Sequence, residues 1–372
     1  MTTVYLDHNA TTPIRPEAME AVTRAMQMGG NPSAVHESGR AARRIVEEAR
    51  ESVAALVGAD PSGVIFTSGG TEANALALKG LRRPRILASA IEHSSVLKQA
   101  YVEHVPVEAS GVIDLFVLQE MLRNRGEPAL VALMLANNET GAIQPVQVAA
   151  KVAHALGAVV HCDAVQAAGR VEIDILALGV ETLSLSAHKI GGPAGVGALV
   201  LADPAEEIEP QLLGGGQEMR RRAGTENLAG IAGFGAAARA AKAAMDGEMK
   251  RLAELRDRIE RYIGERVPGA VFFGDEVARV ANTTCVAFPG IEARTVVMAL
   301  DLVGVEVSAG AACSSGKIDP SHVLAAMGAG DLANSAIRIS LGWTSTEADV
   351  DMFMSAFGRT MARLAFRPAS AA

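Results

Sequence analysis

The chain has 372 residues, of which 49% are hydrophobic, 20% are charged and 3% are aromatic. This composition is ordinary for a globular protein and excludes a disordered chain. A formal net charge of −8 gives no support to a nucleic-acid or anionic-membrane surface, and three cysteines are too few for a disulfide scaffold and favour a reducing compartment. The first residues lack the regions of a signal peptide, and no apolar run reaches the ~18 residues of a membrane span, so we expect a cytoplasmic protein.

Strands and helices are predicted to alternate through the first half of the chain. Apolar residues at helical spacing predict a helix over 36–57, and a second helix is expected over 72–79. Short apolar runs predict fully buried strands at 64–67, 86–90, 130–135, 158–162, 182–186 and 197–201. This alternation favours an α/β fold with a large, doubly wound, mainly parallel sheet.

The character of the sequence changes after about residue 229. A stretch rich in Ala, Arg, Glu and Lys predicts one long helix over 229–261, and strands are expected at 283–288 and 337–341, with further helices around them. We place a domain junction inside the long helix. Residues 12–250 are expected to form the large domain, and residues 1–11 with 251–372 a smaller α+β domain.

A glycine-rich turn, Ser68-Gly69-Gly70-Thr71, lies between a predicted strand and a predicted helix. Backbone N–H groups at a helix N-terminus, together with the Thr71 hydroxyl, form an anion site suited to a phosphate. The alternative is a tight turn in which Thr71 caps the helix.

Two polar residues follow the ends of buried strands. Asp163 ends the strand predicted at 158–162, with Gln166 close behind, and Lys189 follows the strand at 182–186. Such positions face the crevice where α/β proteins bind ligands, although Asp163 would also suit a helix cap and a lone lysine is usually a solvated residue. A phosphate turn, an acid and a desolvated lysine are the three groups that pyridoxal phosphate requires.

Cys313 lies in a run of small residues at 308–316, which predicts an exposed loop and an accessible thiol that can act as a nucleophile. Cys162 and Cys285 fall inside predicted strands, and we expect both to be buried core residues.

His93 follows a predicted strand and titrates near neutrality, whereas Arg338 lies in a strand and can bind a carboxylate through two hydrogen bonds. The alternatives are a structural histidine and an ordinary salt bridge. No CxxC pair or HExxH helix supports a metal site.

These motifs, in this order along residues 4–346, resemble those of the cysteine desulfurases, a branch of the class V aminotransferase-like, fold type I pyridoxal phosphate enzymes. The matching stretches are 5–12, 31–33 with His36, 67–74, 92–93, 137–141, 163–166, 186–191, 214–225 and 308–320. Gly70 stands where relatives often have Ala.

The resemblance implies a role for each matching residue. The cofactor would be held by Gly70, Thr71, His93, Asn138, Asp163, Gln166, Ser186, His188, Lys189 and, from the partner subunit of a homodimer, Thr225. Lys189 would form the Schiff base and His93 would assist proton transfer. Asn138 and Arg338 would bind the substrate carboxylate, and Cys313 would attack the substrate sulfur.

The implied reaction converts L-cysteine to L-alanine and leaves a persulfide on Cys313, from which sulfur passes to an acceptor protein such as an Fe–S scaffold. No nucleic acid, membrane or resident metal is expected, although Cys313 would transiently ligate an Fe–S cluster. A selenocysteine lyase, another class V transaminase and a non-catalytic sulfur-carrier scaffold are the alternatives. The sequence names neither the acceptor nor a preference between cysteine and selenocysteine.

Overall fold

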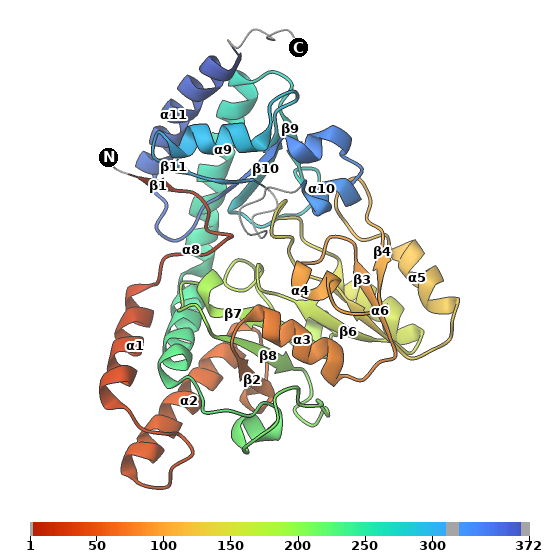
Figure 1. The fold of residues 1–372 in the computed structure, drawn as a ribbon, viewed down its shortest axis with the longest axis vertical. Coiled ribbons are helices and arrows are strands. Elements are labelled where there is room, and N and C mark those ends of the chain that lie inside the picture. Colours follow the sequence, from red (N-terminus) through yellow and green to blue (C-terminus); the bar gives the residue numbers. More distant parts are fainter. Residues whose placement is uncertain (1–2, 310–319, 366–372) are drawn as a thin grey trace.

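The computed structural model describes residues 3–309 and 320–365, and its largest feature is a seven-stranded sheet in the order β2-β8-β7-β6-β5-β3-β4 (Figure 1). Strand β8 runs antiparallel to both its neighbours, whereas the other pairs are parallel. The strands are β2 (Val64–Thr67), β3 (Arg85–Ser89), β4 (Val102–Val105), β5 (Ala129–Ala132), β6 (Val159–Asp163), β7 (Thr182–Ser186) and β8 (Gly197–Leu201). The doubly wound, mainly parallel sheet is therefore confirmed.

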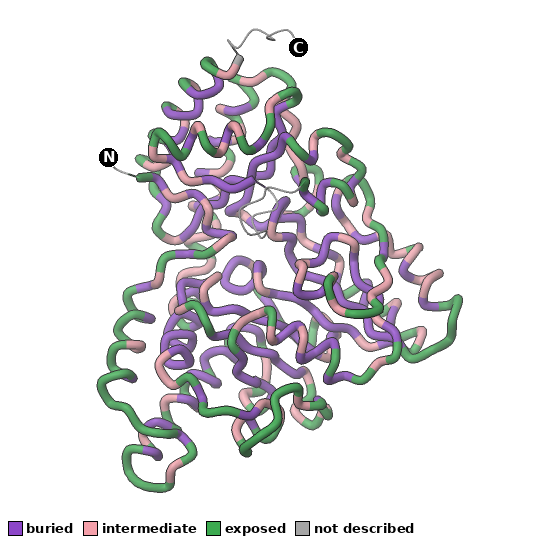
Figure 2. Tube along the Cα trace, viewed as in Figure 1, coloured by how far each residue is buried: buried purple, intermediate pink, exposed green. Residues whose placement is uncertain are grey.

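Both faces of this sheet carry buried apolar side chains, since the side chains of a strand point alternately to its two sides. In β8, Ala198 and Val200 pack against helices α2 and α8, whereas Leu199 and Leu201 pack against α3. Figure 2 shows the trace of these strands as buried. The helices of this unit are α1 (Pro16–Met28), α2 (Glu37–Leu56), α3 (Gly70–Gly80), α4 (Ser94–Leu97), α5 (Leu115–Arg123), α6 (Val146–Ala155) and α7 (Ile175–Leu178).

A second core surrounds a four-stranded antiparallel sheet in the order β12-β13-β10-β9 and a parallel pair, β1 with β11. The predicted strands at 283–288 and 337–341 are found here as β10 and β13. The other strands have two or three residues each, too short to give a sequence signal. The elements are β1 (Val4–Tyr5), β9 (Val271–Phe273), β10 (Thr283–Ala287), β11 (Val305–Glu306), β12 (Ser308–Ala309), β13 (Ala336–Ser340), α9 (Ala293–Asp301), α10 (His322–Ala326) and α11 (Glu347–Ala365).

Helix α8 (Leu228–Arg266) is 39 residues long and joins the two cores (Figure 1). Its buried residues up to Ala241 pack with the central sheet, and those from Leu252 onward pack with the second sheet. The proposed domain boundary at residue 250 falls between these two positions of the helix and stays a prediction.

The backbone of strand β8 lies close to the glycine-rich turn between β2 and α3. Helix α3 begins at Gly70, and its N-cap is Gly69, so the alternative in which Thr71 caps the helix is wrong. A Cβ atom on Gly197 of the adjacent strand β8 would lie 2.6 Å from the carbonyl carbon of Gly69. Small residues on both sides therefore let the helix begin directly at the sheet edge.

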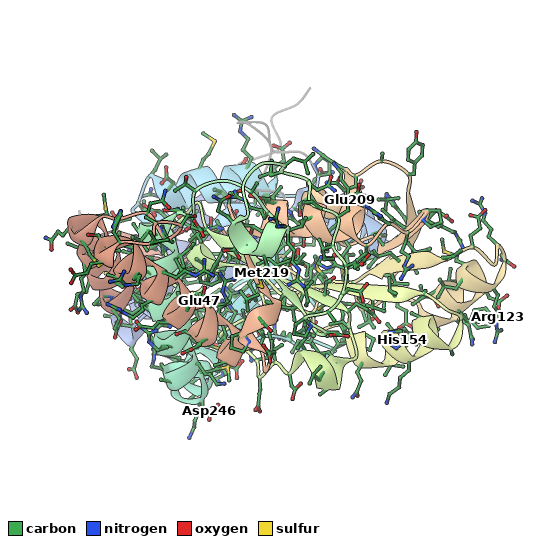
Figure 3. The ribbon with its side chains drawn as sticks, turned by 90° about the horizontal axis from the view of Figure 1, so that it is seen from below. Glu47, Arg123, His154, Glu209, Met219 and Asp246 are labelled. Atoms are coloured by element: carbon green, nitrogen blue, oxygen red, sulfur yellow. The ribbon has the colours of Figure 1, made fainter. Side chains whose placement is uncertain are left out.

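A buried ion pair fixes a strained turn beside this sheet. Glu218, Met219 and Arg220 have φ values of 44°, 54° and 66°, a left-handed conformation that costs about 1–3 kcal/mol per non-glycine residue. The Glu218 carboxylate accepts hydrogen bonds of 2.8 and 3.1 Å from the Arg50 guanidinium and one of 2.9 Å from the Phe66 amide. Glu47 and Met219, neighbours of the pair, are labelled in Figure 3.

We predict that Arg50→Met lowers the free energy of unfolding by about 3–5 kcal/mol, because Glu218 would remain buried without its counter-ion. Arg43→Met is the matched control on the same helix, since Arg43 forms an exposed pair with Glu47 and should contribute less than about 1 kcal/mol. Chemical denaturation measures both, and equal losses would contradict the assignment.

Candidate active site

A cavity of about 410 Å³ lies at the carboxyl ends of the parallel strands, where the central sheet faces β13 and α10. It is lined by Asn9, Ala10, Gly70, Thr71, Asn74, His93, Ser94, Ser95, Met134, Ala136, Asn138, Glu139, Asp163, Val165, Gln166, Ser186, His188, Lys189, His322 and Arg338.

The structure brings ten of the predicted site residues together in this cavity: Gly70, Thr71, His93, Asn138, Asp163, Gln166, Ser186, His188, Lys189 and Arg338. Thr225 is exposed and does not line it. Cys313 lies outside the described residues. The roles of all these residues stay predictions.

One end of the cavity is suited to an anion. The N-terminal residues of α3, Gly70 and Thr71, line it, and no side chain caps this helix, so its first N–H groups point outward as donors. Ser186 and His188 add polar side chains. Burial, and then the nearby charge of Lys189, lowers the pKa of His188 to about 4, so this imidazole is neutral near pH 7.

An acid and an amine lie at the ends of two adjacent strands. Asp163 is the last residue of β6, and its Oδ1 accepts a 3.0 Å hydrogen bond from the Val165 amide. Lys189 follows β7 on a short 3₁₀ turn, and its Nζ donates to the backbone oxygens of Asn9 at 2.5 Å and Ala10 at 2.7 Å. The alternative in which Asp163 caps a helix is wrong, because the next helix after β6 is α7, whose N-cap is Asp174. The Asp163 carboxylate binds the Val165 amide in a local turn while it lines the cavity.

Arg338 presents a guanidinium from β13. Its side chain is 3% exposed, and its two terminal nitrogens donate to Asp7 Oδ1 at 2.6 Å and to the Asn138 backbone oxygen at 3.1 Å. Its buried Nε has no hydrogen-bond partner among residues 3–309 and 320–365. A guanidinium has five N–H donors, so donors remain for a ligand carboxylate.

Sequence reasoning assigned no role to six polar residues of the cavity, Asn9, Asn74, Ser94, Ser95, Glu139 and His322. Asn74 carried a signal, because it is a polar residue on a helix face that otherwise buries Ala73, Leu76 and Ala77. The others reach the site only through the topology of the chain, which the sequence pattern does not reveal.

These side chains fit a phosphorylated pyridine aldehyde. An uncapped helix N-terminus, a carboxylate and a primary amine are the groups that bind its phosphate, ring nitrogen and aldehyde. At Gly70 an added Cβ would lie 2.8 Å from Val165 Cγ2, so glycine at this position makes room for the bulk of Val165 in the cavity wall.

Residues 3–309 and 320–365 contain no group of three or more His, Cys, Asp or Glu side chains placed to hold a metal ion. Within the same ranges, no helix has both the length and the apolar character needed to cross a membrane.

Comparisons with known proteins agree on one family. The model of the class-V aminotransferase family matches residues 4–353. The cysteine desulfurase IscS of Dictyoglomus turgidum is 40% identical over 97% of this chain and 95% of its own length. The solved NifS-like protein of Rickettsia africae has a TM-score of 0.90 and 36% identity, covering 97% of this chain and 99% of that one. The structure of SspA in complex with cysteine has a TM-score of 0.79 and 30% identity, covering 91% and 99% respectively.

We predict that Cys162 and Cys285 resist alkylation in the native protein. Both are fully buried, and burial raises the pKa of each thiol well above its ordinary value, so the reactive thiolate is scarce. Peptide mass spectrometry after iodoacetamide treatment should find both unmodified until denaturant is added. Rapid labelling of either one in the native chain would contradict their assignment to the core.

Proposed function

The chain belongs to the cysteine desulfurases of the class-V aminotransferase family, and we propose that it uses pyridoxal phosphate to take the sulfur atom from free L-cysteine. The observation that carries this proposal is the meeting of Asp163, Lys189 and Arg338 in one cavity. Together they offer partners for the cofactor ring, the cofactor aldehyde and an amino-acid carboxylate.

Different residues of the cavity would bind different parts of the cofactor. Gly70, Thr71, Ser186 and His188 would hold the phosphate, Asp163 the ring nitrogen and Gln166 the phenolic oxygen. When bound, pyridoxal phosphate supplies an electron sink that makes the α-proton of an amino acid removable.

Arg338, with Asn138, binds and orients the substrate carboxylate. The Lys189 amine takes the α-proton. His93 has its pKa lowered, chiefly by burial, with Lys189 and His322 lowering it further and Asp163 opposing them, so its imidazole is neutral near pH 7 and can accept a proton.

Sulfur transfer requires no external oxidant. The Cys313 thiolate attacks the substrate sulfur, a new S–S bond forms, the substrate Cβ–S bond breaks, and Cβ gains a proton. L-cysteine and the Cys313 thiol thereby become L-alanine and a Cys313 persulfide, so atoms and electrons balance.

The persulfide would then pass its outer sulfur to an acceptor protein such as an Fe–S scaffold. The reducing cytoplasm suits this chemistry, because free thiols persist there.

We predict that Cys313→Ala retains the cofactor but releases neither alanine nor sulfide from cysteine. Alanine is used because serine at positions 162 and 285 would bury a hydroxyl in the core. The matched controls, Cys162→Ala and Cys285→Ala, should stay active. Full release of alanine and sulfide by Cys313→Ala would contradict the assignment of Cys313 as the nucleophile.

The proposed homodimer leads to a further prediction. Thr225 lies outside this chain's cavity and on its surface, which suits a role in the partner's cofactor site. Losing one hydrogen bond to a charged group costs about 1.5–3 kcal/mol, so Thr225→Ala should weaken cofactor binding without abolishing folding.

Mixed dimers of a Lys189→Ala subunit and a Thr225→Ala subunit test the sharing directly. If Thr225 acts across the interface, one site carries both lesions and the other is native, so half of the sites should bind cofactor with wild-type affinity. If Thr225 serves its own subunit, no native site appears in the cofactor titration.

A further inference from the structure

Asn74 is a buried residue of α3 whose side-chain amide bonds to three other side chains. Its nitrogen donates to Asp163 Oδ2 at 2.7 Å and to Ser95 Oγ at 2.8 Å, and its oxygen lies 3.0 Å from His161 Nε2. An amide has two N–H donors, and both are used within this cluster. The carboxylate of Asp163 fixes the amide orientation, because it can only accept.

His161 secures the other end of the amide. Burial lowers the pKa of this imidazole to about 4, so it is neutral near pH 7. Since Nε2 faces the amide oxygen of Asn74, Nε2 carries the ring proton, and Nδ1 accepts from the Thr182 hydroxyl at 2.8 Å. Each donor in this part of the cluster therefore meets an acceptor.

Ser95 extends the chain of hydrogen bonds to His93. Its hydroxyl accepts from Asn74 and so has its own proton to give to His93 Nδ1, 2.8 Å away. The Ser95 amide also donates to His93 Nδ1, at 3.1 Å. Two donors on Nδ1 keep the proton of the neutral imidazole on Nε2.

We propose that Asn74 is the positioning residue that couples Asp163 to His93, holding the carboxylate as an acceptor and, through Ser95, holding the His93 proton on Nε2. The Asn74 side chain thereby orients the Asp163 carboxylate, which would face the cofactor ring nitrogen. It also sets the tautomer of His93, whose imidazole would move protons. The relevance to catalysis rests on the proposed function. The hydrogen bonds themselves belong to the protein without cofactor.

Charged and titratable groups from three other elements also act on His93. Asp163 of β6 raises its pKa, whereas Lys189 after β7 and His322 of α10 lower it. None of these residues is changed when Ser95 is replaced. The Ser95 hydroxyl donates to the neutral imidazole and favours that form, so its removal must raise the pKa of His93.

The test compares Ser95→Ala with Asn74→Ala in the full-length chain. NMR titration of labelled imidazoles, with His93 assigned from a His93→Gln variant, gives its pKa without cofactor, and a spectroscopic titration gives the affinity for pyridoxal phosphate. Ser95→Ala should raise the pKa of His93 and leave cofactor affinity within about twofold. Asn74→Ala should raise the pKa and weaken the cofactor by about tenfold or more, because it also removes a hydrogen bond to a charged group.

Leu76→Ala, at a buried position of the same helix, is the matched control. It should lower the melting temperature and leave the pKa of His93 unchanged. The proposal is overturned if Ser95→Ala and Asn74→Ala leave that pKa where Leu76→Ala leaves it, since Asn74 would then be merely structural. Should Asn74→Ala fail to fold, the pKa of His93 in Ser95→Ala still tests the link to His93. The affinity of Asn74→Asp for pyridoxal phosphate then tests the link to Asp163. Since the titration needs no turnover, its result stands even if the desulfurase activity is not found.

Discussion

The register between strands β6 and β7 is the constraint on which the site depends. His161 lies opposite Thr182 and Asp163 opposite Ser184 in this parallel pair. Successive residues of a strand point to opposite faces, so His161 and Asp163 share the face that meets Asn74 of α3, where Asp163 lines the cavity, while Cys162 enters the apolar core. A slip of one residue would place the Cys162 thiol where the carboxylate lies and would bury Asp163 among aliphatic side chains. This register is disfavoured because an unpaired carboxylate is costly to bury in an apolar core.

Burial also decides which groups carry charge around that carboxylate. Glu92 is fully buried, and desolvation together with the nearby Asp163 raises its pKa well above the ordinary range, which drives this carboxyl toward its neutral form. Burial lowers the pKa values of His93, His161 and His188. Most of the titratable groups here are thus pushed toward neutrality, and the long-range charges of Asp163 and Lys189 act in a poorly screened environment.

The sequence predicts those parts of the fold that repeat a local pattern. Strand β7 was expected at 182–186 and lies there, because five consecutive buried residues bounded by turns give a clear signal. Strand β4, Val-Glu-His-Val, was missed, since an edge strand with half-exposed polar residues resembles a loop. The turn predicted at residues 68–71 is confirmed, but the alternative in which Thr71 caps the helix is wrong because the N-cap is Gly69, two residues earlier.

Residues that join the two cores could not be predicted, because their partners are distant in sequence. The Asp7–Arg338 pair and the hydrogen bond from Asn9 Nδ2 to Thr283 Oγ1 both span more than two hundred and fifty positions. The resemblance implies a substrate role for Arg338, but it does not give the bonds that Arg338 forms with Asp7 and with the backbone of Asn138. Only the packed fold brings the N-terminal segment beside β10 and β13.

Asn9 connects the Lys189 side of the cavity to the second sheet. Its backbone oxygen accepts from Lys189 Nζ and from Gln166 Nε2, while its side chain donates to Thr283 and to the backbone of Asn138. One residue of the N-terminal segment thus ties the lysine to the second sheet. In the proposed reaction the Lys189 amine would leave these oxygens, and Asn9 would keep its bonds to Gln166, Thr283 and Asn138. These bonds would hold the cavity wall in place while the lysine moved, so the proposed reactive amine is compatible with a rigid site.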